Sequence, residues 1–251
     1  MGLEGKIGIV TGAGRGIGRA TAVLMAGQGA KVVLVGRSSN IDEVGAEIEK
    51  AGGEAFPVRA DVSDPDAGPG LAQKVIERYG RIDLLVNNAG VHPRVDGNKW
   101  PTILETDVAN WDCNLDNNAR GPFFLTKAII PHMIEQKYGR VVFVSSVTGM
   151  HGRVASPAYN VSKAALICMT KSFADEFGKY NITVNGVAPG YVDTPMNDLI
   201  PPETVAGFVA STPLRRAGRP EDLAYAILMF LQEDLFVTGQ TLVCDGGVVM
   251  Q

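Results

Sequence analysis

The chain has 251 residues, of which 45% are apolar and 20% are charged, and its formal net charge at pH 7 is −4. This composition is ordinary for a globular protein with a substantial core. The acidic balance and the lack of a basic cluster argue against a nucleic-acid partner. The three cysteines form no CxxC pair and the three histidines form no HxxxH or HxH pair, so we expect neither a disulfide framework nor a metal site.

The first residues of the chain carry no recognisable targeting signal. They run straight into an apolar strand pattern, without the charged and apolar regions of a signal peptide. Position 6 is Lys6, where an N-myristoylation motif has Ser or Thr. No apolar run reaches the length of a membrane helix. We therefore expect a cytoplasmic protein that does not bind a membrane.

Apolar runs alternate with helical patterns along the chain. Short runs of Val, Ile and Leu predict strands that are covered on both faces. We expect these strands at residues 6–10, 30–35, 54–59, 82–86, 140–144, 182–187 and 241–243. One helical pattern ends near Gln28 and one at Tyr79, and the others cover residues 42–50, 107–136 (bent near Gly121-Pro122), 157–179, 197–210 and 221–231. The alternation predicts a single α/β domain over residues 1–251, with a doubly wound parallel sheet of about seven strands.

A glycine-rich turn follows the first strand and leads into the first helix. It reads Thr11-Gly12-Ala13-Gly14-Arg15-Gly16-Ile17-Gly18. This is the context of a Rossmann-fold nucleotide site, where the backbone approaches a pyrophosphate because side chains are missing and a helix N-terminus attracts the phosphates. The glycines are spaced GxxxGxG. Taken alone, that spacing is equally compatible with a simple tight turn.

The end of the second strand bears on the choice of cofactor. NAD-binding Rossmann sites usually have an acidic residue there, which binds the ribose 2′-hydroxyl. Here Gly36 stands at that place and Arg37 follows it, while Arg15 lies in the glycine-rich turn. Arginine binds phosphate bidentately. Either arginine alone could be a solvated loop residue, but together they favour NADP(H).

The stretch from Ser146 to Lys163 carries the candidate chemistry. Tyr159 and Lys163 are four residues apart, so on a helix they share one face. A free tyrosine has a pKa of about 10, which a neighbouring cation would lower toward neutrality. Ser146 follows an apolar strand and could offer its hydroxyl to a substrate oxygen. The same Tyr–Lys spacing also occurs in ordinary surface pairs.

These separate motifs occur together in one order. TGAGRGIG at 11–18, NNAG at 87–90, Asn118, Ser146, YNVSK at 159–163, and Pro189-Gly190 resemble the short-chain dehydrogenase/reductase family, through to residues 245–247. The resemblance covers the whole chain. It implies an oxidoreductase that interconverts a ketone or aldehyde and a secondary alcohol with a nicotinamide cofactor, which we expect to be NADP(H).

The resemblance also implies roles for single residues. Tyr159 would be the general acid/base, and Lys163 would lower its pKa and bind the nicotinamide ribose. Ser146 would polarise the substrate oxygen. Asn118 would hold a water in a proton relay, and the spacing from Trp111 favours it over Asn117. Cofactor contacts are implied for Gly12, Gly14, Arg15, Gly16, Ile17, Gly18, Arg37, Asp61, Val62, Asn88, Ala89, Gly90, Tyr159, Lys163, Pro189, Gly190, Val192 and Thr194.

Within the family, the chain is most similar to the 3-oxoacyl-carrier-protein-reductase type. The loop at 90–111 is several residues longer than expected there, and basic residues for docking an acidic carrier protein are sparse. A carrier-linked substrate is therefore an alternative, as is an NAD-linked alcohol or sugar dehydrogenase. An epimerase or dehydratase of this family would tend to be longer. A non-enzymatic nucleotide sensor would be credible if Tyr159 or Lys163 were replaced, and neither is.

Two further expectations concern the substrate and the assembly. The substrate would be a small carbonyl compound or alcohol. The residues expected near its pocket are His92, Arg94, Trp100, Thr148, His151, Arg153, Met196 and Leu199. The helices at 107–136 and 157–179 carry more apolar residues than one side of a sheet needs, and the resemblance implies that they pair across subunits of a homotetramer.

Overall fold

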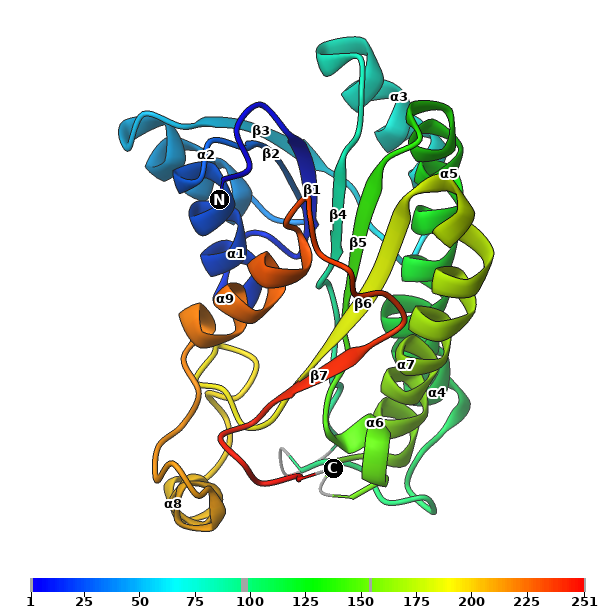
Figure 1. The fold of residues 1–251 in the computed structure, drawn as a ribbon. Coiled ribbons are helices and arrows are strands. Elements are labelled where there is room, and N and C mark those ends of the chain that lie inside the picture. The colour runs from blue at the N-terminus through cyan, green and yellow to red at the C-terminus, as the bar shows by residue number, and fades with distance from the viewer. Residues whose placement is uncertain (1, 96–98, 154, 251) are drawn as a thin grey trace.

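Seven parallel strands form one sheet at the centre of the protein, in the order β3-β2-β1-β4-β5-β6-β7 (Figure 1). The structure is a computed structural model and describes residues 2–95, 99–153 and 155–250. The strands are β1 (Ile7–Thr11), β2 (Lys31–Gly36), β3 (Glu54–Arg59), β4 (Leu84–Asn87), β5 (Gly139–Val144), β6 (Ile182–Pro189) and β7 (Thr241–Cys244). The strand order reverses between β1 and β4, which leaves a crevice at the carboxyl ends of these strands. The predicted α/β class with a doubly wound parallel sheet is confirmed.

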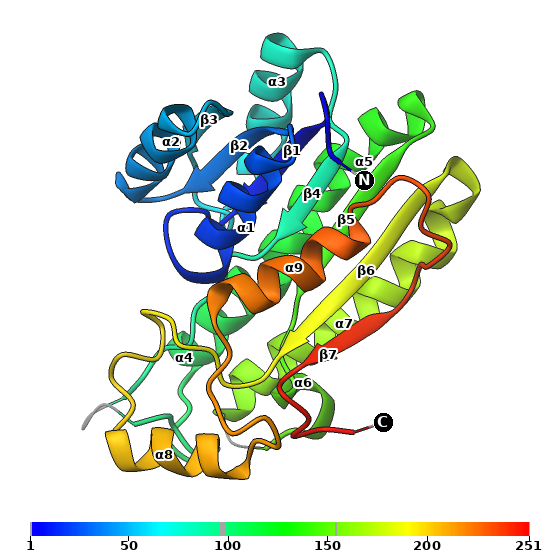
Figure 2. The same cartoon turned by 60° about the vertical axis from the view of Figure 1, so that its left-hand side comes forward.

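Helices cover both faces of the sheet (Figures 1 and 2). One face carries α1 (Gly16–Gly27), α2 (Asn40–Lys50) and α9 (Pro220–Phe230). The other carries α3 (Ala67–Tyr79), α5 (Gly121–Gln136) and α7 (Pro157–Phe177), with α4 (Val108–Leu115) beside α7. The short α6 (Thr148–His151) and α8 (Pro202–Ser211) lie beyond the carboxyl ends of the strands.

The second strand shows how an unbroken apolar run serves both faces. Val32 and Leu34 pack in the core under α1 and α9, whereas Val33 and Val35 pack in the core under α3, α5 and α7. Successive residues of a strand point to opposite faces, so a strand with helices on both sides needs apolar residues at every position. This is why the strand pattern in the sequence was continuous.

The helix expected at residues 107–136 is divided into three segments. Between α4 and α5 lies a π-helical turn, η2 (Asp116–Arg120). A Cβ on Gly121 would overlap the carbonyl oxygen of Val62, so only glycine allows the helix to pass so close. Pro122 has no N–H to donate to the helical ladder. The bend expected near Gly121-Pro122 is therefore a local change of helical register.

Several helices differ from the expectation. α8 begins at residue 202 and not at 197. Helical geometry is disfavoured for a residue that precedes a proline, as Ile200 and Pro201 do, whereas Pro202 is well suited to the first position of a helix. α7 ends at Phe177, and a 3-10 turn, η3 (Gly178–Tyr180), continues it. α6 is too short for a periodic pattern to reveal it.

None of the helices in the described part of the chain is long and apolar enough to cross a membrane. The same described residues contain no group of three or more His, Cys, Asp or Glu residues placed to hold a metal ion.

Candidate active site

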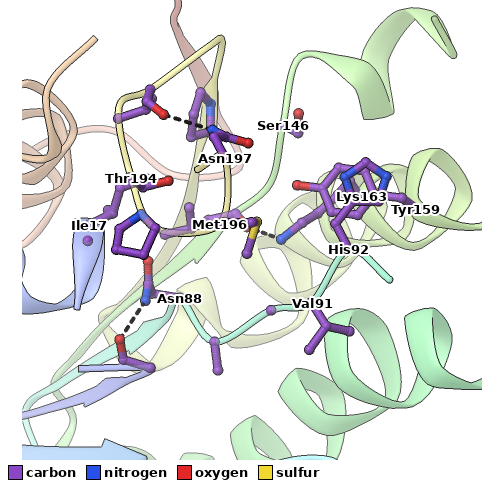
Figure 3. Close-up of a pocket in the computed structure, with 18 of the residues that line it drawn as sticks. Ile17, Asn88, Val91, His92, Ser146, Tyr159, Lys163, Thr194, Met196 and Asn197 are labelled. Carbon is purple, nitrogen blue, oxygen red and sulfur yellow. Dashed lines mark hydrogen bonds between the residues drawn. The ribbon is translucent and has the colours of Figure 1, made fainter. Parts of the chain in front are cut away.

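A cavity of about 700 Å³ lies at the carboxyl ends of the central strands. Segments far apart in the sequence line it, namely the glycine-rich turn, the ends of β2 and β3, residues 88–92, the end of β5, the start of α7, and residues 189–197. Figure 3 shows side chains from these segments pointing into the same space. Of the expected catalytic and cofactor-binding residues, all line the cavity except Gly18 and Asn118.

The glycine-rich turn leads from β1 into α1 at one end of the cavity. Gly12 and Gly16 have positive φ angles of 64° and 54°, which favour glycine. A Cβ on Gly12 would lie 2.9 Å from Nδ2 of Asn88, and one on Gly18 would overlap the carbonyl oxygen of Gly12. Gly18 is therefore needed for close packing of α1 on the turn. The bare turn and the start of α1 form a surface suited to a pyrophosphate.

Asn88 ties the end of β4 to the same turn. Its Nδ2 donates to the carbonyl oxygen of Thr11 at 2.8 Å, and its backbone N–H donates to Oγ1 of Thr11 at 3.0 Å. The N–H of Ala89 donates to the same hydroxyl at 3.0 Å. These bonds hold the NNAG segment next to the glycine-rich turn, where Ala89 and Gly90 line the cavity.

The ends of β2 and β3 form the outer part of this region. Nη1 of Arg37 lies 3.5 Å from Oδ2 of Asp61, and both side chains are exposed. Partial burial opposes ionisation of Asp61, but hydrogen bonds from Ser63 and the charge of Arg37 outweigh it and lower the pKa of Asp61. Arg15 lines the same region and is exposed. Two guanidinium groups therefore face this end of the cavity.

Ser146, Tyr159 and Lys163 meet at the other end (Figure 3). Ser146 follows β5, while Tyr159 and Lys163 lie on α7, whose N-cap residue Ser156 accepts a hydrogen bond from the N–H of Tyr159. Nζ of Lys163 lies 5.6 Å from the centroid of the Tyr159 ring and donates to the carbonyl oxygen of Val144 at 2.9 Å. The Tyr–Lys pair is thus part of the cavity and not a surface pair.

Burial governs the ionisation of this pair. It raises the pKa of Tyr159 to about 12, although a hydrogen bond from Ser146 favours the phenolate. It lowers the pKa of Lys163 to about 8. The sequence led us to expect a lowered pKa for Tyr159, but in this structure the loss of phenolate hydration outweighs the nearby cation. At neutral pH, Tyr159 is therefore a protonated phenol and Lys163 an ammonium ion.

Asn118 lies behind the cavity wall in the π-helical turn and is fully buried. Its Oδ1 accepts from the N–H of Val91 at 2.8 Å, and its Nδ2 donates to the carbonyl oxygen of Val91 at 2.9 Å. A Cβ on Gly90 would lie 3.1 Å from Oδ1 of Asn118 and 3.3 Å from Nζ of Lys163. Asn118 therefore holds the segment after β4 next to Lys163, whereas Asn117 lines the cavity itself.

The substrate end combines expected and unexpected residues. His92, Trp100, Thr148, His151 and Met196 line the cavity as expected, but Arg94, Arg153 and Leu199 do not. Several other lining residues were not expected from the sequence, among them Tyr191, Asn197, Ile200, Phe208, Ser211, Thr212 and Val248. These residues belong to the segment after β6, to α8 and to the C-terminal segment. None of them is part of a motif, and the only available signal was that they follow the carboxyl ends of strands.

Known proteins resemble this chain over its full length. A family model described as enoyl-(acyl carrier protein) reductase matches residues 12–249. The chain is 39% identical over 252 residues to 3-oxoacyl-[acyl-carrier-protein] reductase FabG of Thermotoga maritima, with 100% of both chains covered.

Solved structures give the same picture. A 3-oxoacyl-[acyl-carrier protein] reductase of Brucella melitensis with bound NAD is 34% identical with a TM-score of 0.90, and the match covers 99% of this chain and 92% of that one. A Beutenbergia cavernae protein assigned as an NAD(P)-dependent gluconate 5-dehydrogenase, with NADP bound at low occupancy, is 33% identical with a TM-score of 0.91, and the match covers 98% of each chain. With its sheet order, its glycine-rich turn and its Ser–Tyr–Lys group in one cavity, this chain belongs to the short-chain dehydrogenase/reductase family of nicotinamide-dependent oxidoreductases.

Proposed function

We propose that the protein is an NADP(H)-dependent oxidoreductase that interconverts a ketone or aldehyde and a secondary alcohol. One observation carries the proposal, namely that a single cavity joins the glycine-rich turn to Ser146, Tyr159 and Lys163. The turn fits a dinucleotide because any side chain at Gly12 would fill the space beside Asn88. The turn would hold the pyrophosphate. Val192 and Thr194 would hold the carboxamide, and Lys163 the nicotinamide ribose.

The chain's own residues would manage the proton and the orientation of the substrate. The bound nicotinamide supplies or accepts the hydride. Ser146 would hydrogen-bond the substrate oxygen. Tyr159 is protonated at neutral pH because its pKa is about 12, so it can give its proton to a carbonyl oxygen that gains charge. Lys163 would stabilise the phenolate that remains, and in the reverse direction Tyr159 would accept the carbinol proton.

Asn118 is proposed to hold the water of a relay that returns the proton. Its side chain is committed to Val91, so the backbone carbonyl oxygen is the atom left for this task. In a regular α-helix that carbonyl would accept from the N–H of residue 122, but Pro122 has none. The π-helical turn at this point is a local departure of the kind that often accompanies functional sites.

The preference for NADP(H) over NAD(H) rests on the charges at the adenosine end. The 2′-phosphate of NADP is dianionic near neutral pH, and Arg37 and Arg15 supply positive charge there. Gly36 brings no carboxylate that would repel the phosphate. Asp61 is partly neutralised by Arg37, which lies 3.5 Å away.

A 3-oxoacyl-[acyl-carrier-protein] reductase is the second candidate. The observation in its favour is the full-length similarity to the Thermotoga maritima enzyme of that name. The two candidates predict different responses to the carrier. If the acyl carrier protein is recognised, a 3-oxoacyl group on the carrier should have a much lower KM than the same group on a small thiol.

A homotetramer is proposed for the assembly. Val108, Trp111, Phe123 and Val161 are 38–75% exposed on α4, α5 and α7. These helices lie side by side on one face of the sheet. An exposed apolar surface of this kind commonly forms contacts between copies of a chain.

The experiment is a screen of ketones, aldehydes and secondary alcohols with NADPH and NADP⁺, repeated with NADH and NAD⁺. Turnover of at least one compound should be seen, and it should be lost in Tyr159→Phe but kept in Tyr225→Phe. Tyr225 is the matched control because it is 62% exposed on α9 and does not line the cavity. Binding of the cofactor without turnover of any carbonyl compound or alcohol would refute the proposal.

A further inference from the structure

We infer that the substrate end of the cavity selects an uncharged ketone or secondary alcohol that carries a ring beside the reacting carbon. The inference deepens the proposed function and rests on it. Three observations support it: an aromatic wall that includes Tyr159, a second aromatic and apolar wall, and the absence of arginine and carboxylate side chains from the described lining at this end of the cavity.

Trp100, His92 and Tyr159 form the first wall as one stack of rings. The centroids of His92 and Tyr159 are 4.1 Å apart with 23° between the planes, and those of His92 and Trp100 are 5.0 Å apart with 10° between the planes. The N–H of Ser156 donates to Nε2 of His92 at 3.4 Å, which holds the imidazole at the start of α7. All three rings line the cavity. A substrate whose oxygen reaches Tyr159 must therefore lie next to aromatic surface.

The second wall comes from the segment after β6 and from α8. Tyr191 and Phe208 stack with centroids 5.3 Å apart and 31° between the planes. Met196 and Ile200, from the same segment as Tyr191, also line the cavity. Figure 3 places the segment with Met196 on one side of the cavity and His92 with Tyr159 on the other. Aromatic rings gain energy by packing on such surfaces beyond the burial of their area, so the space between the walls suits a ring.

Among the described lining residues, the only lysine, arginine or carboxylate side chain at the substrate end is Lys163. Among the described lining residues, Arg15, Arg37 and Asp61 lie at the adenosine end and Lys163 lies beside Tyr159. Burial lowers the pKa of His92 to about 3, with smaller contributions from nearby cations, so its imidazole is neutral at neutral pH. The guanidinium of Arg94 lies over the Trp100 ring, 5.1 Å from its centroid, and does not line the cavity.

This distribution of charge argues against an anionic substrate. A carboxylate that enters an apolar cleft loses its hydration and is stable there only if a cation or several hydrogen bonds replace it. The ammonium of Lys163 donates to Val144 and is assigned to the cofactor ribose and to the phenolate of Tyr159. A neutral ring-bearing ketone has no such cost and gains contact with both walls.

The experiment uses four methyl ketones that differ in charge and in the presence of a ring, with NADPH and the full-length protein. They are methyl 4-acetylbenzoate, 4-acetylbenzoate, methyl 5-oxohexanoate and 5-oxohexanoate. In the open-chain pair, saturated carbons separate the ester or carboxylate from the ketone, so charge is changed there with little effect on reactivity. In the ring pair the para ester also activates the ketone through the ring, so the open-chain pair carries the comparison of charge. We expect kcat/KM for each ester to exceed that for its acid at least tenfold, and the ring ester to exceed the open-chain ester.

A variant tests the wall itself. Trp100→Ala should reduce the ratio of kcat/KM for the ring ester to that for the open-chain ester about threefold to tenfold, the range expected for one aromatic contact. Trp100→Phe should restore most of the ratio, and Tyr225→Phe should leave it unchanged.

The possible outcomes separate the inference from the proposed function. Acids reduced as well as their esters, or a ring ester no better than the open-chain ester, would overturn the inference while the proposed function stood. If no carbonyl compound were reduced with NADPH or NADH, the proposed function would fall and the inference with it. Should Trp100→Ala not fold, Trp100→Phe and the four wild-type rates still decide the matter.

Discussion

Removal of the Arg37 side chain should reduce the preference for NADPH by about tenfold. The Arg37 side chain is 61% exposed and lies 3.5 Å from Asp61, so water and a carboxylate already share its charge. A charge-assisted hydrogen bond contributes roughly 1.5–3 kcal/mol, and an exposed, shared guanidinium should fall at the lower end. Because about 1.4 kcal/mol corresponds to a factor of ten, Arg37→Ala should lower kcat/KM for NADPH about tenfold. NADH has no 2′-phosphate, so its kcat/KM should change little.

The assay is the steady-state rate with NADPH and with NADH against one ketone. Arg59→Ala is the matched control, since Arg59 is 60% exposed on β3, pairs with Asp42 and does not line the cavity. It should leave both cofactors unaffected. If Arg37→Ala lowered the rates with both cofactors equally, or if the wild-type protein used NADH as well as NADPH, the reasoning from the two arginines would be wrong.

Reversal of the preference needs a carboxylate as well. Gly36→Asp combined with Arg37→Ala should make NADH the better cofactor, because an acid at this place binds the ribose 2′-hydroxyl and repels a phosphate. The structure adds a cost that the sequence did not reveal. A Cβ at Gly36 would lie 2.8 Å from Cγ2 of Ile41, so Ile41 must move. We therefore expect the double variant to have a lower Tm than Arg37→Ala alone.

Three other predictions follow from the site and the surface. Tyr159→Phe should bind NADPH nearly normally but lose turnover by roughly 10²–10⁴, the contribution of general acid–base catalysis; a variant that kept most of its activity would refute the role. Lys163→Met should raise the free energy of unfolding at pH 7, measured in urea, because burial lowers the pKa of Lys163 to about 8 and so makes the buried ammonium unfavourable. The extra stability of Lys163→Met over the wild type should shrink by about 1.4 kcal/mol per pH unit as the pH rises from 8 toward 10.5, the pKa of lysine in the unfolded chain. In this range the unfolded wild-type chain still binds a proton that the folded chain has lost, so the wild type becomes more stable as the pH rises. A stability difference independent of pH would contradict the assignment. Light scattering at micromolar concentration should give the mass of a tetramer, and a monomer mass would rule out pairing through α4, α5 and α7.

Much of the fold could be predicted from the sequence because the relevant signals are local. The run at 31–36 predicts a strand covered on both faces, and its alternate residues do pack in the two cores. The glycine-rich turn predicts a bare turn before a helix, and Gly12 and Gly16 have the positive φ angles that favour glycine. Short-range steric requirements of this kind are written in the residues themselves.

The properties of the site depended on segments that are distant in the sequence. The spacing of Tyr159 and Lys163 predicted a common face, but the raised pKa of Tyr159 comes from burial under elements that the spacing does not describe. His92 was a loop residue in the sequence, and only the tertiary structure placed it between Trp100 and Tyr159. A strand pattern records which residues are covered, whereas the pKa of a group and the shape of a cavity depend on what covers them. The residues that cover the site come from distant segments, which only the tertiary structure brings together at the crevice between β1 and β4.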